Sequence, residues 1–553
     1  MVLNRRIESI GEHCSLYSFI KQHCLGESSG LSHNSAFHRL CSLARKMRVE
    51  TAVIEEIAPE YAEISDECIA LIKYFGQPIK FQPYRITFLT ERVSSFNDIL
   101  SLSSEHFLAS AVVMNFQDPK KDNNWKSYLF NALFTIPKIR NYKGAGTSIP
   151  LQNNYLHIHK KFKREISISK DETFQFDITG TFFCQQNSLT SVCAHASLCM
   201  VLNNTREEAD LITPENINKI VGVDHEQVKL KGGGGDFIFS NEQIKKVLNQ
   251  YGLTYRLIDF FENPNIEYNE YIYRYIESKC PVLLIFTTHD ILSDLHVVPI
   301  FGHTLNSDKW QPEAQSAYSN PPAVRTDYFM STSAWVDHFI IHDDNLGMYF
   351  CLPVDSLKRI TLPKYDPAFR ANYAVIILPA KVTTLHEEAE WAATIVTLEL
   401  LESRKGTPQP LDDWTNRIID RIGKVKPIVM RTFLTTKEDY AESLEKSDFE
   451  ENVFTSIDKE ELLKILPSRF WLSEITIPDL FTANKTKIID FFYGCEYPES
   501  RNPKIICTRW LQIRFPYVLI RNDGGTPQPA VSMSVKSHYP LLKFEHEQDT
   551  LDW

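Results

Sequence analysis

Apolar and polar residues along the chain repeat with both the helical and the strand period, in segments of moderate length. Residues 36–57 and 61–74 carry apolar positions at helical spacing. Runs with the composition of strands follow at 81–89, 107–116, 127–135 and 155–168. This mixture predicts an α+β domain over residues 1–165.

The rest of the chain divides at changes of pattern and at a proline-rich stretch. Residues 381–405 predict one helix, which Gly406 and the prolines after it end. Further strands are predicted at 470–477 and 510–520. We therefore predict a multidomain α+β protein in four parts: an accessory domain at 1–165, a central domain at 166–384, a helix and linker at 385–410, and a second accessory domain at 411–553.

The composition is that of an ordinary globular protein. Of the 553 residues, 43% are hydrophobic and 23% are charged, which excludes wholesale disorder. The 59 Lys and Arg against 70 Asp and Glu give a net charge of −11, so the surface has no general attraction for nucleic acid or anionic membranes. No apolar run reaches the roughly 18 residues that span a bilayer, and the first residues lack an apolar signal core. We expect a cytoplasmic protein without nucleic-acid or membrane partners.

The eleven cysteines are scattered, odd in number and without a CxxC pair. This pattern argues against a disulfide framework and against a zinc ribbon. We expect most of the cysteines to be reduced and buried, and we expect neither a metal nor a cofactor. The composition leaves open whether one cysteine carries chemistry.

The segment 180–204, GTFFCQQNSLTSVCAHASLCMVLNN, contains the candidate nucleophile. From Val192 onward it is apolar on nearly all sides, which predicts a helix buried at the centre of a domain. Thr190 and Ser191 are favourable N-cap residues, so Cys193 falls in the first turn. The free N–H groups and the dipole of a helix N-terminus stabilise a thiolate, the nucleophilic form of cysteine. The same pattern also fits a buried structural cysteine, and the segment alone favours neither interpretation.

Residues near Cys193 include two other cysteines, which are alternative nucleophiles, and three side-chain amides, which could assist catalysis. Cys184 precedes the helix and Cys199 lies about two turns inside it. Neither has the field of the helix end, so we expect both to be structural. The amides of Gln185, Gln186 and Asn187 are candidate donors to an oxyanion.

A nucleophilic cysteine needs a base, and two later segments offer one together with an orienting acid. Residues 295–303 place His296 at the start of an apolar strand. A later stretch predicts a strand, a turn and a second strand, with Asp343 at the end of the first. If these strands are neighbours, the order Cys, His, Asp makes a workable triad. His303 and His342 are the alternative bases.

The helix CAHASLCMVLNN, the strand HVVPIFG and the strand end IIHDDN together resemble the papain-like cysteine peptidases, most closely their bacteriocin-leader-peptidase-like branch. That branch has a Gln before a helix that begins with Cys, a His strand that ends in Gly, and an acidic strand end. The resemblance covers about residues 170–380. It implies Cys193 as the nucleophile, His296 as the general base, Asp343 as the orienting acid and Gln186 as an oxyanion donor, without a cofactor.

The chain departs from that pattern at three points. The oxyanion Gln of such families stands six residues before Cys, where this chain has Asn187, so Gln186 requires a one-residue insertion. Ala194 and His195 replace the Gly or Trp that follows the nucleophile. Pro299 lies inside the histidine strand, which favours an edge or a bulge at that position.

Four consecutive glycines at 232–235 precede a capping box that Ser240 and Gln243 are expected to form. The glycines match no phosphate-binding loop, because no Gly-Lys-Ser/Thr follows them. They are expected to form a surface loop, or to border a substrate groove.

Three functions fit these features. The first is a peptidase or isopeptidase that forms an acyl-enzyme with a peptide or protein substrate, which the flanking domains select through protein contacts. The second is a papain-like acyltransferase, phytochelatin-synthase-like or transglutaminase-like, which passes the acyl group to an amine or thiol. The third is a catalytically inactive papain-like scaffold used for binding. The sequence favours the first.

Overall fold

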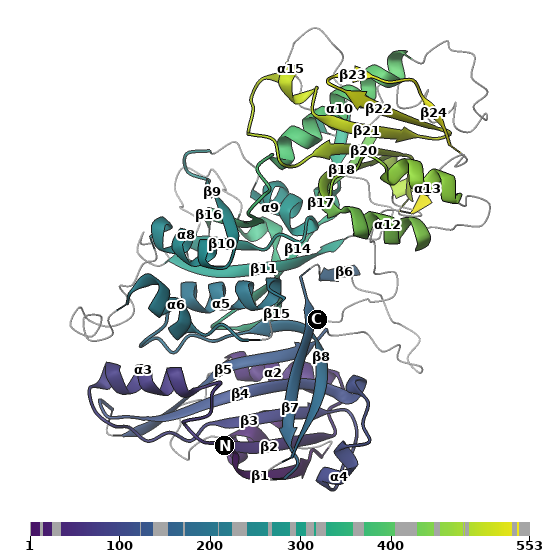
Figure 1. Cartoon of the computed structure of the whole chain (residues 1–553). Coiled ribbons are helices and arrows are strands. Elements are labelled where there is room, and N and C mark those ends of the chain that lie inside the picture. Colours follow the sequence, from purple (N-terminus) through teal and green to yellow (C-terminus); the bar gives the residue numbers. More distant parts are fainter. Residues whose placement is uncertain are drawn as a thin grey trace.

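The chain forms three large β-sheets that follow one another along the molecule, with helices between and around them (Figure 1). The predicted α+β class is therefore confirmed. The predicted glycine loop at 232–235 and the predicted linker after residue 403 lie outside the described residues. The computed structural model describes residues 2–11, 15–24, 35–121, 123–136, 153–156, 158–169, 172–207, 210–223, 240–263, 268–287, 295–305, 315–316, 328–357, 370–403, 428–446, 454–478, 480–481, 486–533 and 539–540.

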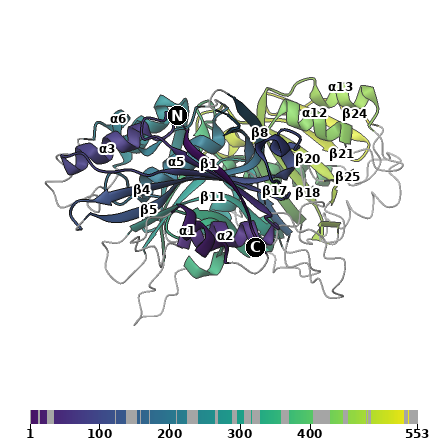
Figure 2. The same cartoon turned by 90° about the horizontal axis from the view of Figure 1, so that it is seen from below.

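The first sheet is antiparallel and has helices on both faces (Figure 2). Its strands in spatial order are β1 (Val2–Ser9), β2 (Thr51–Ile57), β3 (Tyr84–Leu89), β4 (Phe107–Asp118), β5 (Asn124–Thr135), β8 (Thr173–Phe183) and β7 (Lys160–Ser167). Helices α1 (Leu16–Cys24) and α2 (Ser35–Lys46) pack on one face and α3 (Ser65–Phe75) on the other, while α4 (Phe96–Ile99) is a single capped turn. Because both faces are covered, β4 is buried along nearly its whole length.

The second sheet lies above the first and carries most of the candidate site. Its strands in spatial order are β15 (Gly347–Pro353), β14 (His338–Asp343), β11 (Leu295–Leu305), β10 (Val282–Thr287), β16 (Arg370–Pro379) and β9 (Leu253–Asp259), and β6 (Asn153–Leu156) also pairs with β11. The apolar helix α5 (Cys193–Thr205) packs against β11 on one side and β8 on the other. This double packing explains why its sequence is apolar nearly all round. Helices α6 (Pro214–Val221) and α8 (Asn241–Gln250) complete the layer, and the predicted Ser240–Gln243 capping box of α8 is confirmed.

The third sheet joins the second through helices that both sheets share. Its strands in spatial order are β12 (Gln315–Ser316), β13 (Tyr328–Ser331), β17 (Ile428–Thr436), β18 (Arg469–Thr476), β20 (Ile489–Gly494), β21 (Trp510–Phe515), β22 (Val518–Asp523) and β23 (Thr526–Pro527), with β24 (Val531–Ser532) beside β22. Helix α9 (Tyr268–Glu277) contacts both β11 and β17, and α10 (His386–Ser403) lies against β17, β18 and β20. Helices α12 (Lys437–Lys446) and α13 (Ser456–Leu463) cover the far face. The remaining elements are α15 (Pro503–Ile506) and the pair β19 (Thr486–Lys487) and β25 (Tyr539–Pro540).

Four predictions differ from the structure. The predicted strand at 510–520 is two strands, β21 and β22, which form a hairpin. The predicted helix at 36–57 is α2 followed by the strand β2, whose residues are buried between β1 and β3. The predicted strand at 155–168 is divided between β6 and β7, which belong to different sheets. The predicted boundary at 165 falls inside β7, which pairs with β8, so the first sheet continues to Phe183. Pairing partners elsewhere in the chain decide the cases of 36–57 and 155–168, and local composition does not reveal them.

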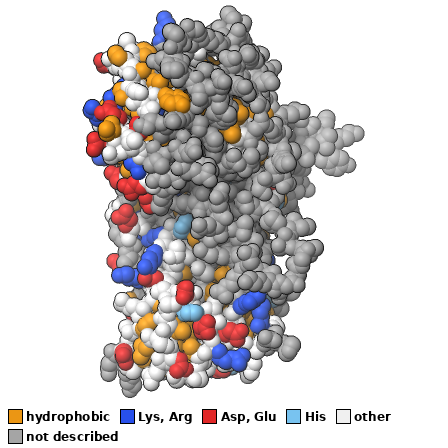
Figure 3. All heavy atoms as spheres, turned by 90° about the vertical axis from the view of Figure 1, so that its right-hand side faces the viewer, with side chains coloured by type: hydrophobic (Ala, Val, Ile, Leu, Met, Phe, Trp, Pro, Cys, Tyr) orange, Lys and Arg blue, Asp and Glu red, His pale blue; other side chains and the backbone are white. Residues whose placement is uncertain are grey.

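Two further expectations concern the surface and the thiols. Within the described part of the chain, no helix has the length and apolarity to cross a membrane. The cysteines among the described residues are all free thiols. Acidic and basic side chains both occur on the described part of the face in Figure 3.

Candidate active site

Cys193 is the first residue of α5, so its predicted place in the first turn is confirmed. The predicted caps are wrong, because the N-cap is Val192, whose backbone is extended. Ser191 instead accepts a hydrogen bond from the N–H of Asn187, and the ring of His195 accepts one from the N–H of Val192 at 3.3 Å. Cys193 is partly exposed, at the end of the helix where unpaired N–H groups and the dipole favour negative charge.

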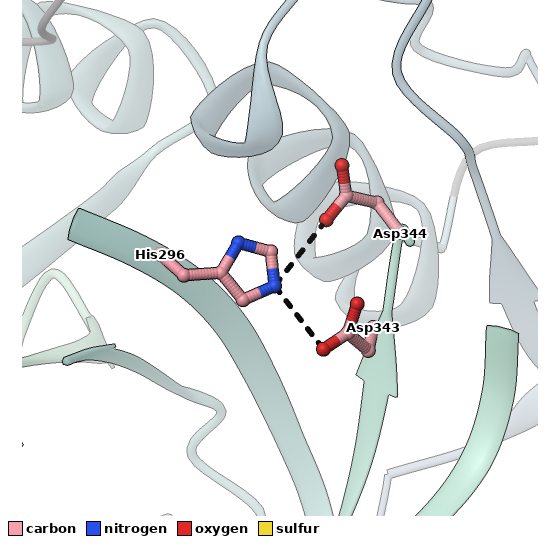
Figure 4. Close-up of side chains that lie close together, drawn as sticks. All are labelled: His296, Asp343 and Asp344. Carbon is pink, nitrogen blue, oxygen red and sulfur yellow. Dashed lines mark hydrogen bonds and ion pairs between the residues drawn. The ribbon is translucent and has the colours of Figure 1, made fainter. Parts of the chain in front are cut away.

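His296, near the start of β11, lies between the thiol and an acid from another strand. Its Nε2 is 3.1 Å from Oδ2 of Asp343 (Figure 4). The imidazole also forms a side-chain hydrogen bond with Cys193, which contributes to its pKa. Since Nε2 faces the acid, Nδ1 is the ring nitrogen that remains for the thiol. The ring of Phe286 meets the imidazole edge-on, with centroids 5.5 Å apart. Three segments that are far apart in the sequence therefore bring together Cys193, His296 and Asp343, the residues of the predicted triad.

The two strands that carry His296 and Asp343 are neighbours, as the triad requires. Their register shifts between Ile300 and Gly302, and Pro299 stands directly before this irregularity. Proline has no N–H to donate, and the ladder between β11 and β14 covers only residues from Ile300 onward. Pro299 pairs with Leu283 of β10 on one side and lies beyond the ladder with β14 on the other, which is the edge-like position that the sequence predicted as one of two possibilities.

The carboxylate of Asp343 is fixed at both oxygens. Oδ1 accepts hydrogen bonds from the N–H groups of Asn345 and Leu346 at 2.8 and 3.1 Å, while Oδ2 faces the imidazole. Burial alone would raise the pKa of Asp343, but the hydrogen bond and charge of His296 and these two N–H groups lower it. The group is therefore an anion held in one orientation beside the ring.

The same contacts set the charge of the imidazole. Burial would lower the pKa of His296, but hydrogen bonds to Asp343 and Cys193, together with the charges of Asp343 and Asp344, raise it to about 10. At neutral pH the ring is an imidazolium. A cation beside a thiol at a helix N-terminus favours the thiolate.

Asp344 is a site residue that the sequence reasoning did not single out. It is only 1% exposed, and its Oδ1 lies 3.7 Å from Nε2 of His296 (Figure 4). Neither of its oxygens has a hydrogen-bond partner among the described residues. Burial and the charge of Asp343, opposed by the charge of His296, raise the pKa of Asp344 to about 7. The signal available in the sequence was the Asp-Asp pair at the strand end.

The three candidate amide donors have different surroundings. Gln185 accepts a hydrogen bond from the N–H of Leu129 at 2.8 Å, which ties it to β5. Asn187 accepts from three N–H groups of the loop before α5 and therefore shapes that loop. Gln186 donates to the side chain of Asn345 at 3.4 Å, in the turn that follows the two aspartates. Of the three, Gln186 is the one whose amide contacts the turn that holds Asp343.

The rival residues occupy structural positions. Cys184 and Cys199 are buried, and burial, with the hydrogen bond and charge shared with Cys184, raises the pKa of Cys199 well above its usual value. His303 lies inside β11 with its Nε2 3.3 Å from a carboxylate oxygen of Glu277. His342 is enclosed by aromatic rings, and burial lowers its pKa to about 3.

A separate cavity of about 570 Å³ opens between the first sheet and the residues before α6. Arginines and acids share its lining, among them Arg85 and Arg164, and each of these two arginines faces a glutamate. Its lining includes none of the triad residues.

Comparisons with known proteins found no match for this chain. No protein-family model matches it, and neither does any curated protein or any solved structure.

Proposed function

We propose that the protein is a cysteine hydrolase of papain-like type that cleaves a peptide-type bond in a peptide or protein. The observation that carries this proposal is the placement of His296 between Cys193 and Asp343, with hydrogen bonds to both. The helix end and the imidazolium both favour a thiolate, which the chemistry requires.

Acylation follows from these positions. The thiolate of Cys193 attacks the carbonyl carbon, and the carbon–sulfur bond forms as the carbonyl oxygen takes the negative charge. The N–H of Cys193 and the amide of Gln186 hold this oxyanion. The imidazolium of His296 gives its Nδ1 proton to the leaving amine, and the carbon–nitrogen bond breaks.

Deacylation reverses the proton transfers. His296, now neutral, accepts a proton from a water molecule that attacks the thioester. The carbon–sulfur bond breaks, the acid product leaves, and the thiolate–imidazolium pair returns. Throughout, Asp343 holds the ring by Nε2 so that Nδ1 faces the reacting atoms.

The test is cleavage of a mixed peptide library, with new N-termini identified by mass spectrometry. We expect wild-type protein and the thiol control Cys507→Ala to produce the same cleavages, with water rather than an added amine as the acyl acceptor. Cys193→Ala should reduce the cleavage rate by more than about 10⁴-fold, because the nucleophile is lost. Cleavage by Cys193→Ala at the wild-type rate, or no cleavage by the folded wild-type protein, would contradict the proposal.

A further inference from the structure

The proposed triad makes no use of Asp344, although this side chain faces the same ring nitrogen as Asp343. It is buried, it carries no hydrogen bond from a described residue, and its Oδ1 lies 3.7 Å from Nε2 of His296. A buried carboxyl group without partners costs free energy. His296 is an ion-pair partner at 3.7 Å, beyond hydrogen-bond distance, and a bound metal ion would contact the carboxylate directly.

The donor atoms are spaced as a metal ion requires. Nε2 of His296 and one oxygen each of Asp343 and Asp344 all lie within 4.8 Å of one another. The two distances from Nε2 are 3.1 and 3.7 Å, and tetrahedral zinc with bonds of 2.0–2.1 Å separates its ligand atoms by about 3.3 Å. We propose that His296, Asp343 and Asp344 bind one divalent transition-metal ion, for which Zn²⁺ is the probe.

The ligand set indicates the class of metal. One imidazole with two carboxylates suits a borderline ion such as Zn²⁺, whereas Mg²⁺ and Ca²⁺ prefer oxygen ligands alone. Three protein ligands leave a fourth position for water. The N–H groups of Asn345 and Leu346 hold the free oxygen of Asp343, which is the kind of outer contact that orients a metal ligand.

Metal binding would switch off the proposed reaction, and this consequence rests on the proposed function. The ion takes the electron pair of Nε2, and the proton of that nitrogen goes to solvent. The remaining ring proton then sits on Nδ1, facing the thiol, so the ring cannot take up the proton of Cys193, and it is a weaker acid toward the leaving amine than the imidazolium. Zinc is therefore expected to act as a reversible inhibitor.

The binding test uses Zn²⁺ in competition with a chromophoric chelator, in a Cys193→Ala background that removes the thiol. We expect this variant to bind a zinc ion that Cys193→Ala/Asp344→Asn binds more weakly. The zinc affinity of the double variant should be lower by more than about 10-fold, which is the low end for losing an outer contact. The control is Cys193→Ala/Glu105→Gln, because His106 also has two acids near it, at 3.4 and 3.8 Å. The control should bind like its parent.

Two results would overturn the inference. One is equal zinc affinity with and without Asp344. The other is loss of the zinc ion in Cys193→Ala alone, which would assign it to the thiol and the ring. Co²⁺ separates the same cases in wild-type protein, since only thiolate coordination gives a strong charge-transfer band in the near ultraviolet.

The experiments can reject the metal site and the proposed hydrolase function independently of each other. Zinc binding that depends on Asp344 in a protein without hydrolase activity would support the metal site and reject the proposed function. Hydrolysis that zinc leaves unchanged, with no Asp344-dependent binding, would reject the metal site alone.

Discussion

Asp343 holds the imidazole of His296 with one oxygen and the turn that follows with the other. Asp343 is therefore a positioning residue that also sets the charge of the imidazole ring. Its carboxylate, together with the other polar contacts, raises the pKa of His296 to about 10, against the effect of burial.

Replacing Asp343 by Ala is expected to reduce the rate of hydrolysis by about 10²–10³-fold, because the ring loses both its orientation and its anion. Asp343→Asn keeps an acceptor but loses the charge, so its effect should be smaller. In both variants the pKa of His296 falls from about 10 toward its usual 6.5. The imidazolium is then lost at lower pH, and the alkaline limb of the pH–rate profile should move to lower pH. A limb that stays in place would contradict this role.

His386 tests the same electrostatic reasoning far from the site. Its ring is buried at the start of α10, with Nε2 3.0 Å from the carbonyl oxygen of Thr432. Burial first, and then the charge of Arg274, lower its pKa well below 6.5. The folded protein therefore keeps this ring neutral at a pH where the unfolded chain binds a proton, and stability is lost as the pH falls below 6.5.

The expected result for His386→Gln is a flatter acid limb. Below pH 6.5, the free energy of unfolding should fall faster for the wild type than for His386→Gln. The slopes should differ by up to about 1.4 kcal/mol per pH unit, which corresponds to the uptake of one proton on unfolding. Urea unfolding at several pH values measures this slope. An equal slope in wild type and His386→Gln would refute this explanation.

At the scale of elements, α2 of the first layer supports the hairpin that ends the triad strand. Arg39 on α2 donates to the carbonyl oxygens of Met348 and Tyr349 in β15 and lies over the ring of Phe350. Gly347, where the turn enters β15, has φ +117° and lies against Arg39. The turn is thus held by a helix about three hundred residues earlier in the chain.

Gly347→Ala is expected to destabilise the protein by about 1–3 kcal/mol, since the residue needs a left-handed backbone. Its added Cβ would also lie 2.7 Å from Cβ of Arg39. Gly11→Ala is the matched control, because a Cβ there meets nothing within 4 Å. Urea unfolding of both variants measures the difference, and equal stability of the two would show that the turn tolerates a side chain.

The elements that were predictable from the sequence are those whose signals are local. The hairpin around Asp343 and the histidine strand follow from composition and turn residues. The start of α5 was predicted near its true position, although the cap is Val192 and not Thr190 or Ser191. The division of 155–168 between two sheets, and the burial of Asp344, depend on partners from other parts of the chain. The triad was predictable only in part. Its residues could be identified from the sequence, but their proximity depends on the pairing of β11 with β14.

At the scale of the whole molecule, the layers share their cores. One apolar cluster joins α1, α2 and the first sheet to α5 and β11, and another joins α9 and β10 to the third sheet. Buried ion pairs cross the second junction: Arg431 of β17 bonds both Glu277 of α9 and Glu474 of β18, and Lys487 bonds Glu474 in turn.

We therefore expect the fragment 166–384, the sequence-based central domain, not to fold on its own. It would lack the strands that pair with β8 and the sheet that covers α9. Removing Arg431 would also leave Glu277 and its neighbours as buried charges, which costs several kcal/mol. Circular dichroism and limited proteolysis of the fragment test this, and a cooperative unfolding transition of the isolated fragment would contradict it.

Activation of Cys193 by His296 is measured most directly by alkylation of the thiol with iodoacetamide as a function of pH. Peptide mass spectrometry reports Cys193 and Cys507 in the same sample. Cys507 is an internal control, because burial and the charge of Glu399 raise its pKa to about 11. An ordinary thiol, with a pKa near about 8.5, would react slowly at pH 6.

We predict that Cys193 is alkylated at pH 6 far faster than Cys507, by at least about 10²-fold. His296→Ala should abolish this advantage in protein that urea unfolding shows to be folded at the pH of the assay. Alkylation of Cys193 as slow as that of Cys507, or fast alkylation that persists in a folded His296→Ala variant, would contradict the account.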